Sequence, residues 1–143
     1  MSTRPEDLLS RYSEAIRTRD ARMIAADYAP GALAYDLAPP LQHDAAATVD
    51  LAELDAWFET WEDDLRVDHR PPTVVQNGDL AVLWCLQHMH GTKKGEGRTS
   101  LWFRTTLAAR LIDGAWKIAH IHTSVPFAMD GSGKAMLDLE PEA

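Results

Sequence analysis

Two histidine pairs are the residues whose types and spacing are best suited to chemistry. His88 and His90, and likewise His120 and His122, are separated by one residue, so in a strand both imidazoles of a pair lie on one face. Because imidazole titrates near neutral pH, either pair is suited to moving a proton. Paired imidazoles also bind metals, but the next acidic residue, Glu96, has the wrong spacing for a His-x-His metal signature. We therefore expect no metal site, with a metal-dependent enzyme and purely structural histidines as the alternatives.

One arginine, Arg104, falls in the middle of a long predicted strand. A guanidinium buried there requires a negative partner, because an uncompensated buried charge is strongly destabilising. Asp36, a ligand carboxylate or a phenolate would serve, and a structural ion pair is the alternative. Arg104 is therefore a candidate for binding the ligand or assisting catalysis.

The elements that position these side chains begin with helices. A capping-box pattern at residues 3–6 precedes an apolar stripe at helical spacing that includes Tyr12. Asp20 and Asp50 stand where they would cap a second and a third helix. Between those two helices we expect a short strand over residues 32–37 and a polar loop over residues 41–49.

After residue 65 the apolar period changes from that of a helix to that of a strand. Asn77-Gly78 and Asp113-Gly114 are hairpin signals, and Pro71-Pro72 interrupts the first candidate strand. This order predicts an α+β fold in which a curved antiparallel sheet wraps around three N-terminal helices and leaves a cavity between the layers. The expected strands are 67–76, 80–90, 98–112 and 115–127.

Length and composition fit a single domain over residues 1–143. Lys and Arg number 14 against 22 Asp and Glu, a net charge of −8, so we expect no binding to nucleic acid or to an anionic membrane. No apolar run reaches the ~18 residues that span a bilayer, and the polar N-terminus is not that of a signal peptide. With a single cysteine, Cys85, no internal disulfide can form, and we expect a cytoplasmic protein.

Four stretches carry a resemblance to a known family: Tyr28–Asp36, Asp36–Leu41, Leu101–Thr106 and Asp113–Phe127. Together with the order of elements, they resemble the nuclear transport factor 2-like superfamily, and within it the SnoaL-like and ketosteroid-isomerase-like proteins. The resemblance covers residues 5 to about 140. It implies a cone-like α+β barrel with an enclosed pocket, and the pairing of two copies sheet to sheet as a homodimer.

The resemblance also implies roles for two residues. Ketosteroid isomerases carry a catalytic aspartate at the end of the first strand, which falls on Asp36, and a helix-one tyrosine, matched by Tyr12 located 24 residues earlier. The carboxylate shuttles an α-proton while the phenol stabilises the enolate oxygen. Their protonated aspartate is missing here, because its slot falls near Thr106, a weaker donor. A turn-organising Asp36 and a core Tyr12 remain the alternatives.

Strand parity, counted from the turn at residues 113–114, divides the sheet into two faces. The face expected to line the cavity contains Trp102, Arg104, Thr106, Ala119, Ile121 and Thr123. The other face is more apolar, carries His120 and His122, and is the expected dimer interface. A one-residue bulge would mix the two sets, and in the wrong register His120 and His122 line the cavity instead.

We therefore expect a cofactor-independent acid–base enzyme of the isomerase, dehydratase or cyclase type, acting on a small, apolar, carbonyl-bearing molecule. Asp36 is the expected base and Tyr12 the donor, assisted by Arg104, His120 or His122. The expected partners are this small-molecule ligand and a second copy of the chain. A non-catalytic ligand-binding or assembly module of the same fold is the main alternative. The residues expected to contact the substrate are Tyr35, Trp84, His88, Trp102, Thr106, Ile121 and Thr123.

Overall fold

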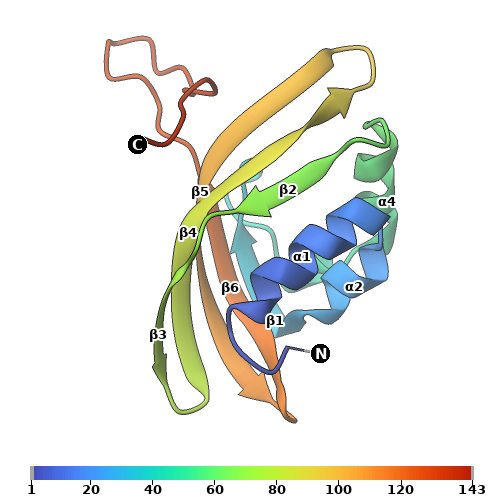
Figure 1. Ribbon diagram of the computed structural model, residues 1–143, viewed down its shortest axis with the longest axis vertical. Helices are drawn as coiled ribbons and strands as arrows, with labels where there is room; N and C mark the ends of the chain where they lie inside the picture. The colour runs from blue at the N-terminus through green and yellow to red at the C-terminus, as the bar shows by residue number, and fades with distance from the viewer. Residues whose placement is uncertain (1, 143) are drawn as a thin grey trace.

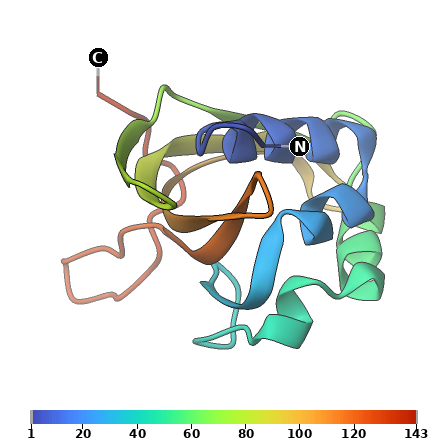
Figure 2. The same cartoon turned by 90° about the horizontal axis from the view of Figure 1, so that it is seen from below.

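A computed structural model describes residues 2–142 and contains one six-stranded sheet with helices against its concave face (Figure 1). The strands pair in the order β1-β6-β5-β4-β2, and β3 also pairs with β4. Seen from below, the sheet curls beside the helices (Figure 2), which confirms the expected cone-like α+β fold. The elements are α1 (Asp7–Thr18), α2 (Ala21–Ala26), β1 (Tyr28–Tyr35), α3 (Ala45–Thr48), α4 (Leu51–Glu59), β2 (Arg66–His69), β3 (Thr73–Asn77), β4 (Leu80–Lys93), β5 (Gly97–Ile112) and β6 (Ala115–Ser124).

The first half of the chain differs from the predicted elements in three ways. Residues 45–48 form the short helix α3 inside the expected loop, because the Asp44 carboxylate accepts a hydrogen bond from the N–H of Ala47 and caps it. β1 begins four residues before the predicted strand, at Tyr28. It also runs parallel to β6, so the sheet is not wholly antiparallel as expected. Helices, not a hairpin, separate β1 from the remaining strands, which permits the parallel pairing.

Side-chain caps begin the helices, although not every predicted cap is present. Asp20 and Asp50 accept backbone N–H bonds at the starts of α2 and α4, as predicted. The capping box expected over residues 3–6 does not form. Instead, Asp7 accepts bonds from two backbone N–H groups in the turn that precedes it. The turn is therefore held by the first residue of α1 itself.

The later strands follow the predicted hairpins closely. β2 and β3 are separated by Pro71-Pro72, as predicted, and both pair with β4. β6 ends at Ser124, three residues before the predicted end at 127, and the following segment folds back so that Phe127 bridges Ala135. Within the described residues, no helix has the length and apolar character needed to cross a membrane.

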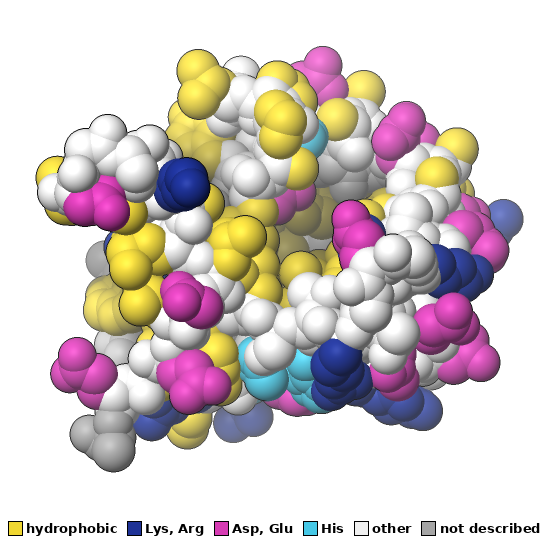
Figure 3. Space-filling view, turned by 90° about the horizontal axis from the view of Figure 1, so that it is seen from above, with side chains coloured by type: hydrophobic (Ala, Val, Ile, Leu, Met, Phe, Trp, Pro, Cys, Tyr) yellow, Lys and Arg dark blue, Asp and Glu magenta, His cyan; other side chains and the backbone are white. Residues whose placement is uncertain are grey.

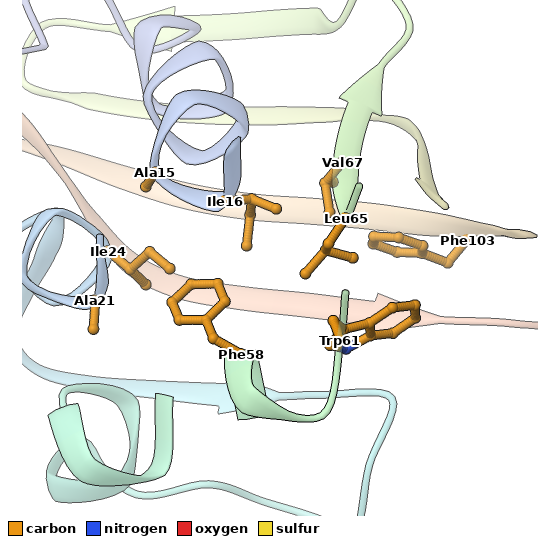
Figure 4. Packing of buried hydrophobic residues seen from close by; sticks show 9 residues of the cluster. All are labelled: Ala15, Ile16, Ala21, Ile24, Phe58, Trp61, Leu65, Val67 and Phe103. Atoms are coloured by element: carbon orange, nitrogen blue, oxygen red, sulfur yellow. The ribbon is translucent and has the colours of Figure 1, made fainter. Parts of the chain in front are cut away.

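The core lies between the helices and the inner face of the sheet and is divided into two clusters. The first cluster includes Ile16, Phe58, Trp61 and Phe103 (Figure 4). The second includes Leu8, Leu9, Leu83, Leu107 and Trp116. Helix α1 contributes Leu8 and Leu9 to the second cluster and Ala15 and Ile16 to the first. It therefore runs along the sheet from one cluster to the other. Its middle turn, with Tyr12, therefore lies between them.

The register of β5 against β6 decides which side chains enter this core. Ile112 opposes Ala115, as the two-residue turn predicts. A bulge between residues 108 and 109 then shifts the register by one, so that Leu107 opposes Ile121 and Thr106 opposes His122. Opposed residues share a face of the sheet. The two sets expected from simple parity are therefore mixed, as a bulge was expected to do.

The face toward the helices is the more apolar one, contrary to the expected assignment. Phe103, Thr105 and Leu107 are buried under the helices, whereas Arg104 and Thr106 between them are exposed. The physical reason is that the helices bury whichever sheet face removes more apolar surface from water. Hereafter this is the inner face, and the opposite face is the outer face.

Candidate functional site

A hollow opens at one end of the cone, between the inner face and the helices (Figure 3). Partly buried apolar side chains pack on the first core cluster: Tyr12, Met23, Tyr28, Leu54, Trp57, Met89, Leu101 and Val125. A groove of about 750 Å³ lies at one side, between the loop over residues 36–42 and the end of β6. Cavities of this size hold small molecules.

Asp36 lies in this groove, in the loop that follows β1. One carboxylate oxygen, Oδ1, accepts hydrogen bonds from the N–H of Leu37 at 2.7 Å and the hydroxyl of Thr123 at 3.3 Å. Asp36 is exposed and lies one residue beyond the end of β1. The carboxylate is thus oriented through Oδ1, and Oδ2 makes no hydrogen bond with a described residue.

Two phenols, Tyr12 on α1 and Tyr28 at the start of β1, pack against the first core cluster. Burial raises the pKa of Tyr12, and the charges of Tyr28 and Asp36 raise it further. Burial, and then the charge of Asp36, raise the pKa of Tyr28 to about 12. Both phenols therefore stay protonated at neutral pH and act as hydrogen-bond donors. Asp36 is close enough to influence both of them.

A buried polar pair lies deeper on the inner face, on neighbouring strands β4 and β5. The Thr105 hydroxyl donates to Oε1 of Gln87 at 2.6 Å, and the two residues are 1% and 2% exposed. The Gln87 amide nitrogen is buried without a hydrogen-bond partner among the described residues. An unpaired buried donor is costly. Ser2, Ser13 and Trp61 also have a buried polar atom without a partner among the described residues, so the Gln87 amide by itself does not mark the site.

Of the residues expected to line the cavity, Ile121 and Thr123 do face inward, and Asp36 and Tyr12 join them. Sequence reasoning missed Tyr28, Gln87 and Thr105. The signal for all three was a spacing of two residues from strongly apolar positions, as Thr105 has from Phe103 and Leu107. This spacing marks the buried face of a strand.

The remaining expected contact residues on β4 and β5 lie on the outer face of the sheet. Trp84 opposes Thr106, and His88 opposes Trp102, all on the outer face, with Trp84 43% exposed. Arg104 is on the same face, exposed rather than buried, and donates to the Ser124 hydroxyl at 3.2 Å. Because its guanidinium is solvated, it needs no anionic partner.

His120, His122 and Tyr35 form a second group on the outer face. The Tyr35 ring meets those of His120 and His122 edge-on, with centroids 4.6 and 5.4 Å away. Nδ1 of His120 is 2.7 Å from the carbonyl oxygen of Leu33. The extra residue in β6 places His120 and His122 on the outer face. Tyr35 and His122 nevertheless line the groove that holds Asp36, whereas His120 is not among its lining residues.

Three side chains have the chemistry and spacing to hold a metal ion. Asp68 on β2 and His88 and His90 on β4 place their ligand atoms within 4.8 Å of one another. Burial and the neighbouring His90 lower the pKa of His88, which favours its neutral ring. This group is on the outer face and is therefore separate from the hollow.

Comparison with known proteins agrees with this geometry. Residues 6–128 match the model of a family described as a SnoaL-like domain. A solved NTF2-like protein of unknown function from Pseudomonas putida is 30% identical, with a TM-score of 0.80 over 95% of this chain and 93% of that one. A ketosteroid isomerase-like protein from Erwinia carotovora is 23% identical, with a TM-score of 0.66 over 84% of this chain and 92% of that one.

A further solved structure shares the fold alone. It is described as a putative calcium/calmodulin-dependent protein kinase II association domain from Xanthomonas campestris, and it is 17% identical with a TM-score of 0.71 over 94% of this chain and 86% of that one. The search of curated proteins found no match. Since the family model spans most of the chain and the architecture agrees, this chain belongs to the SnoaL-like domain family of the NTF2-like superfamily.

Proposed function

We propose that this chain is a cofactor-independent acid–base enzyme that moves a proton on a small, largely apolar, carbonyl-bearing molecule. One observation carries the proposal. The Asp36 carboxylate lies in a groove of about 750 Å³, where Thr123 and the N–H of Leu37 orient one of its oxygens, and its charge contributes to keeping the Tyr12 and Tyr28 phenols protonated by raising their pKa. A base and a neutral donor that share a site are the minimum for enolisation.

The reaction follows from these groups. Asp36, held through Oδ1, takes a proton from the carbon next to the carbonyl on its free oxygen. The electron pair moves onto the carbonyl oxygen, where the protonated Tyr12 phenol donates a hydrogen bond. Return of the proton to another carbon gives an isomer, loss of a β-hydroxyl gives a dehydration product, and attack on a second carbonyl closes a ring.

The donors favour a neutral substrate. Near Asp36, the phenols of Tyr12 and Tyr28 stay protonated at neutral pH. The groove around Asp36 is also lined by Gln42, His122, Thr123 and Ser124, and the residues that line it include no lysine or arginine. A substrate carboxylate would therefore meet the Asp36 charge without a lysine or arginine in the groove to offset it. We therefore expect neutral ketones or related carbonyl compounds, with an acceptor oxygen directed toward the donors.

Hydrogen–deuterium exchange tests the proposal without knowledge of the natural substrate. The full chain is incubated in D₂O with a panel of small cyclic and aryl ketones, and loss of the α-proton signals is followed by NMR. Asp36→Asn should slow the enzyme-catalysed exchange by about 10²–10⁴-fold with the fold retained. Glu59→Gln, which alters an exposed carboxylate on α4, should leave it unchanged. Wild-type exchange rates in Asp36→Asn would refute the role of Asp36.

A non-catalytic binding or assembly module of the same fold is the second candidate, favoured by the outer face. Val75, Val82 and Trp84 are 57%, 36% and 43% exposed there, and Arg104 is the charged residue at its centre. Because two chains of net charge −8 repel each other, they would meet through the part of this face around Trp84 and Arg104, away from the exposed carboxylate of Asp68 beside His88. We propose that a second copy covers this part of the outer face as a homodimer.

Light scattering after size exclusion tests the homodimer. The wild type should elute as a dimer and Trp84→Lys as a monomer, because two lysines would be buried near the two-fold axis. Leu51→Lys, which changes an exposed apolar side chain on α4, serves as the matched control and should remain dimeric. A monomeric wild type would refute the assembly. A chain that binds ketones in the hollow but exchanges none of them would favour the binding module.

A further inference from the structure

Asp68, His88 and His90 form a cluster on the outer face that the proposed reaction does not use. Asp68 on the edge strand β2 is directly opposite His88 on β4, so the two side chains share a face. His90, two residues further along β4, is on that face too. The pairing of two strands therefore adds a carboxylate to a histidine pair.

The donor atoms are spaced nearly as a bound ion requires. Nε2 of His90 is 2.8 Å from Oδ2 of Asp68, and the three ligand atoms all lie within 4.8 Å of one another. Metal–ligand bonds of ~2.0–2.2 Å hold neighbouring ligand atoms about 3 Å apart. An ion can therefore replace the proton between His90 and Asp68 without backbone movement, while His88 closes in by side-chain rotation.

We propose that Asp68, His88 and His90 bind one divalent transition-metal ion on the outer face of the sheet. Two imidazoles and one carboxylate favour zinc, cobalt or nickel over magnesium or calcium, which prefer all-oxygen sites. The Asp68 side chain is 66% exposed, so water completes the coordination. The net charge of −8 also favours a cation at the surface.

Binding requires two local contacts to be exchanged. Nε2 of His88 is 2.7 Å from the Ser100 hydroxyl, and its ring stacks on those of His90 and Trp102 with centroids 4.6 and 4.4 Å away. Because nearly parallel rings cannot both point at one ion, His88 must turn out of the stack. The contact of 3.3 Å between Arg98 and Nδ1 of His90 must also be released. Arg98 keeps its other hydrogen bond, which it donates to the Asp64 carboxylate at 3.0 Å. Metal binding should therefore change the fluorescence of Trp102.

The second histidine pair is the matched control. His120 and His122 have the same spacing on β6, but no carboxylate joins them in such a cluster among residues 2–142. Nδ1 of His120 also lies against a backbone carbonyl oxygen. Substitution of His122 therefore removes an imidazole of the same kind without touching the proposed ligands.

Cobalt titration of the metal-free full chain tests the proposal. We expect one Co²⁺ per chain with visible d–d absorption, zinc competing for the same site, and binding at least ~10-fold weaker in Asp68→Asn and in His90→Gln. His122→Asn should bind as the wild type does. A wild type that binds no ion, or binding unchanged in both ligand variants, would overturn the proposal.

A second measurement needs no variant. Zinc added to the wild type should shift the imidazole NMR signals of two of the six histidines, and shifts confined to the other four would overturn the assignment. The metal site is independent of the hollow, so ketone exchange by the metal-free chain should be unaffected. Failure of one proposal therefore leaves the other standing.

Discussion

Replacement of Gln87 by Met and Thr105 by Val in one chain should stabilise the protein. In the wild type the Thr105 hydroxyl satisfies Oε1 of Gln87, but the amide nitrogen is buried without a partner among the described residues. One orphaned buried polar group costs ~1–3 kcal/mol, whereas replacing both partners of a hydrogen bond by apolar groups of similar shape is nearly neutral. The double variant removes the orphan, so its free energy of unfolding should rise by ~1–3 kcal/mol.

The single variants separate the contributions. Thr105→Val leaves both ends of the Gln87 amide unpaired and should lower the free energy of unfolding by ~1–3 kcal/mol. Gln87→Met removes the orphaned amide but leaves the Thr105 hydroxyl without its acceptor, so the two effects should nearly cancel. The expected order of stability is therefore the double variant first, then the wild type and Gln87→Met together, then Thr105→Val.

Urea denaturation measures this order through the transition midpoint at constant slope, so the assay needs no substrate. A double variant less stable than the wild type by about 1 kcal/mol or more would refute the reasoning, because the amide must then have a partner such as a bound water. Stabilisation accompanied by loss of ketone exchange would show that this buried pair serves the site at the expense of stability.

Three further predictions concern stability. Because the pKa of Tyr12 is raised from 10.0, the folded state holds this proton longer than the unfolded chain. The free energy of unfolding should therefore fall as pH rises above 10, and it should fall less steeply in Tyr12→Phe. Denaturation at several pH values measures this, and the same dependence on pH in both proteins would contradict the prediction. Gly91→Ala would place Cβ 2.8 Å from the Cα of Leu65 and should cost ~1–3 kcal/mol in urea, so an unchanged midpoint would be inconsistent with this contact. Arg11 pairs with a buried Asp27 at 2.9 Å. Arg11→Met should therefore lower the thermal midpoint, by ~2–4 °C for each kcal/mol of stability lost. An unchanged midpoint would mean that the ion pair contributes nothing to stability.

Local signals predicted most of the elements but could not predict which sheet face turns inward. The Asp20 and Asp50 caps and the two hairpin turns depend on neighbouring residues, and all four are confirmed. The bulge between residues 108 and 109 has no comparable signal, because each residue around it suits a strand. That single shift moved the histidines of β6 to the outer face. Arg104 and Trp102 lie there because the helices cover the more apolar face of β5, with Phe103, Thr105 and Leu107.

The residues of the candidate site were likewise predicted only in part. The family resemblance predicted Asp36 and Tyr12 as catalytic residues, and their roles stay predictions. The structure places Asp36 in the groove beside β6 and packs Tyr12 on the first core cluster. Gln87 was missed because its significance depends on a missing partner, which is a property of packing. Asp68 was missed as a possible metal ligand because it lies 20 residues before His88 in the chain and meets it through strand pairing.

The sequence by itself determined the helices, the hairpins, the acidic charge and the spacing of the chemical groups, since these depend on short-range preferences and on composition. Only the tertiary structure decided which groups meet. The face of a long strand is set by register, and register depends on the burial of apolar surface by helices distant in the chain. The Asp36 carboxylate therefore meets Thr123 and His122 of β6 at one groove, while His88 and His90, although their spacing is equally evident in the sequence, lie away from it on the outer face.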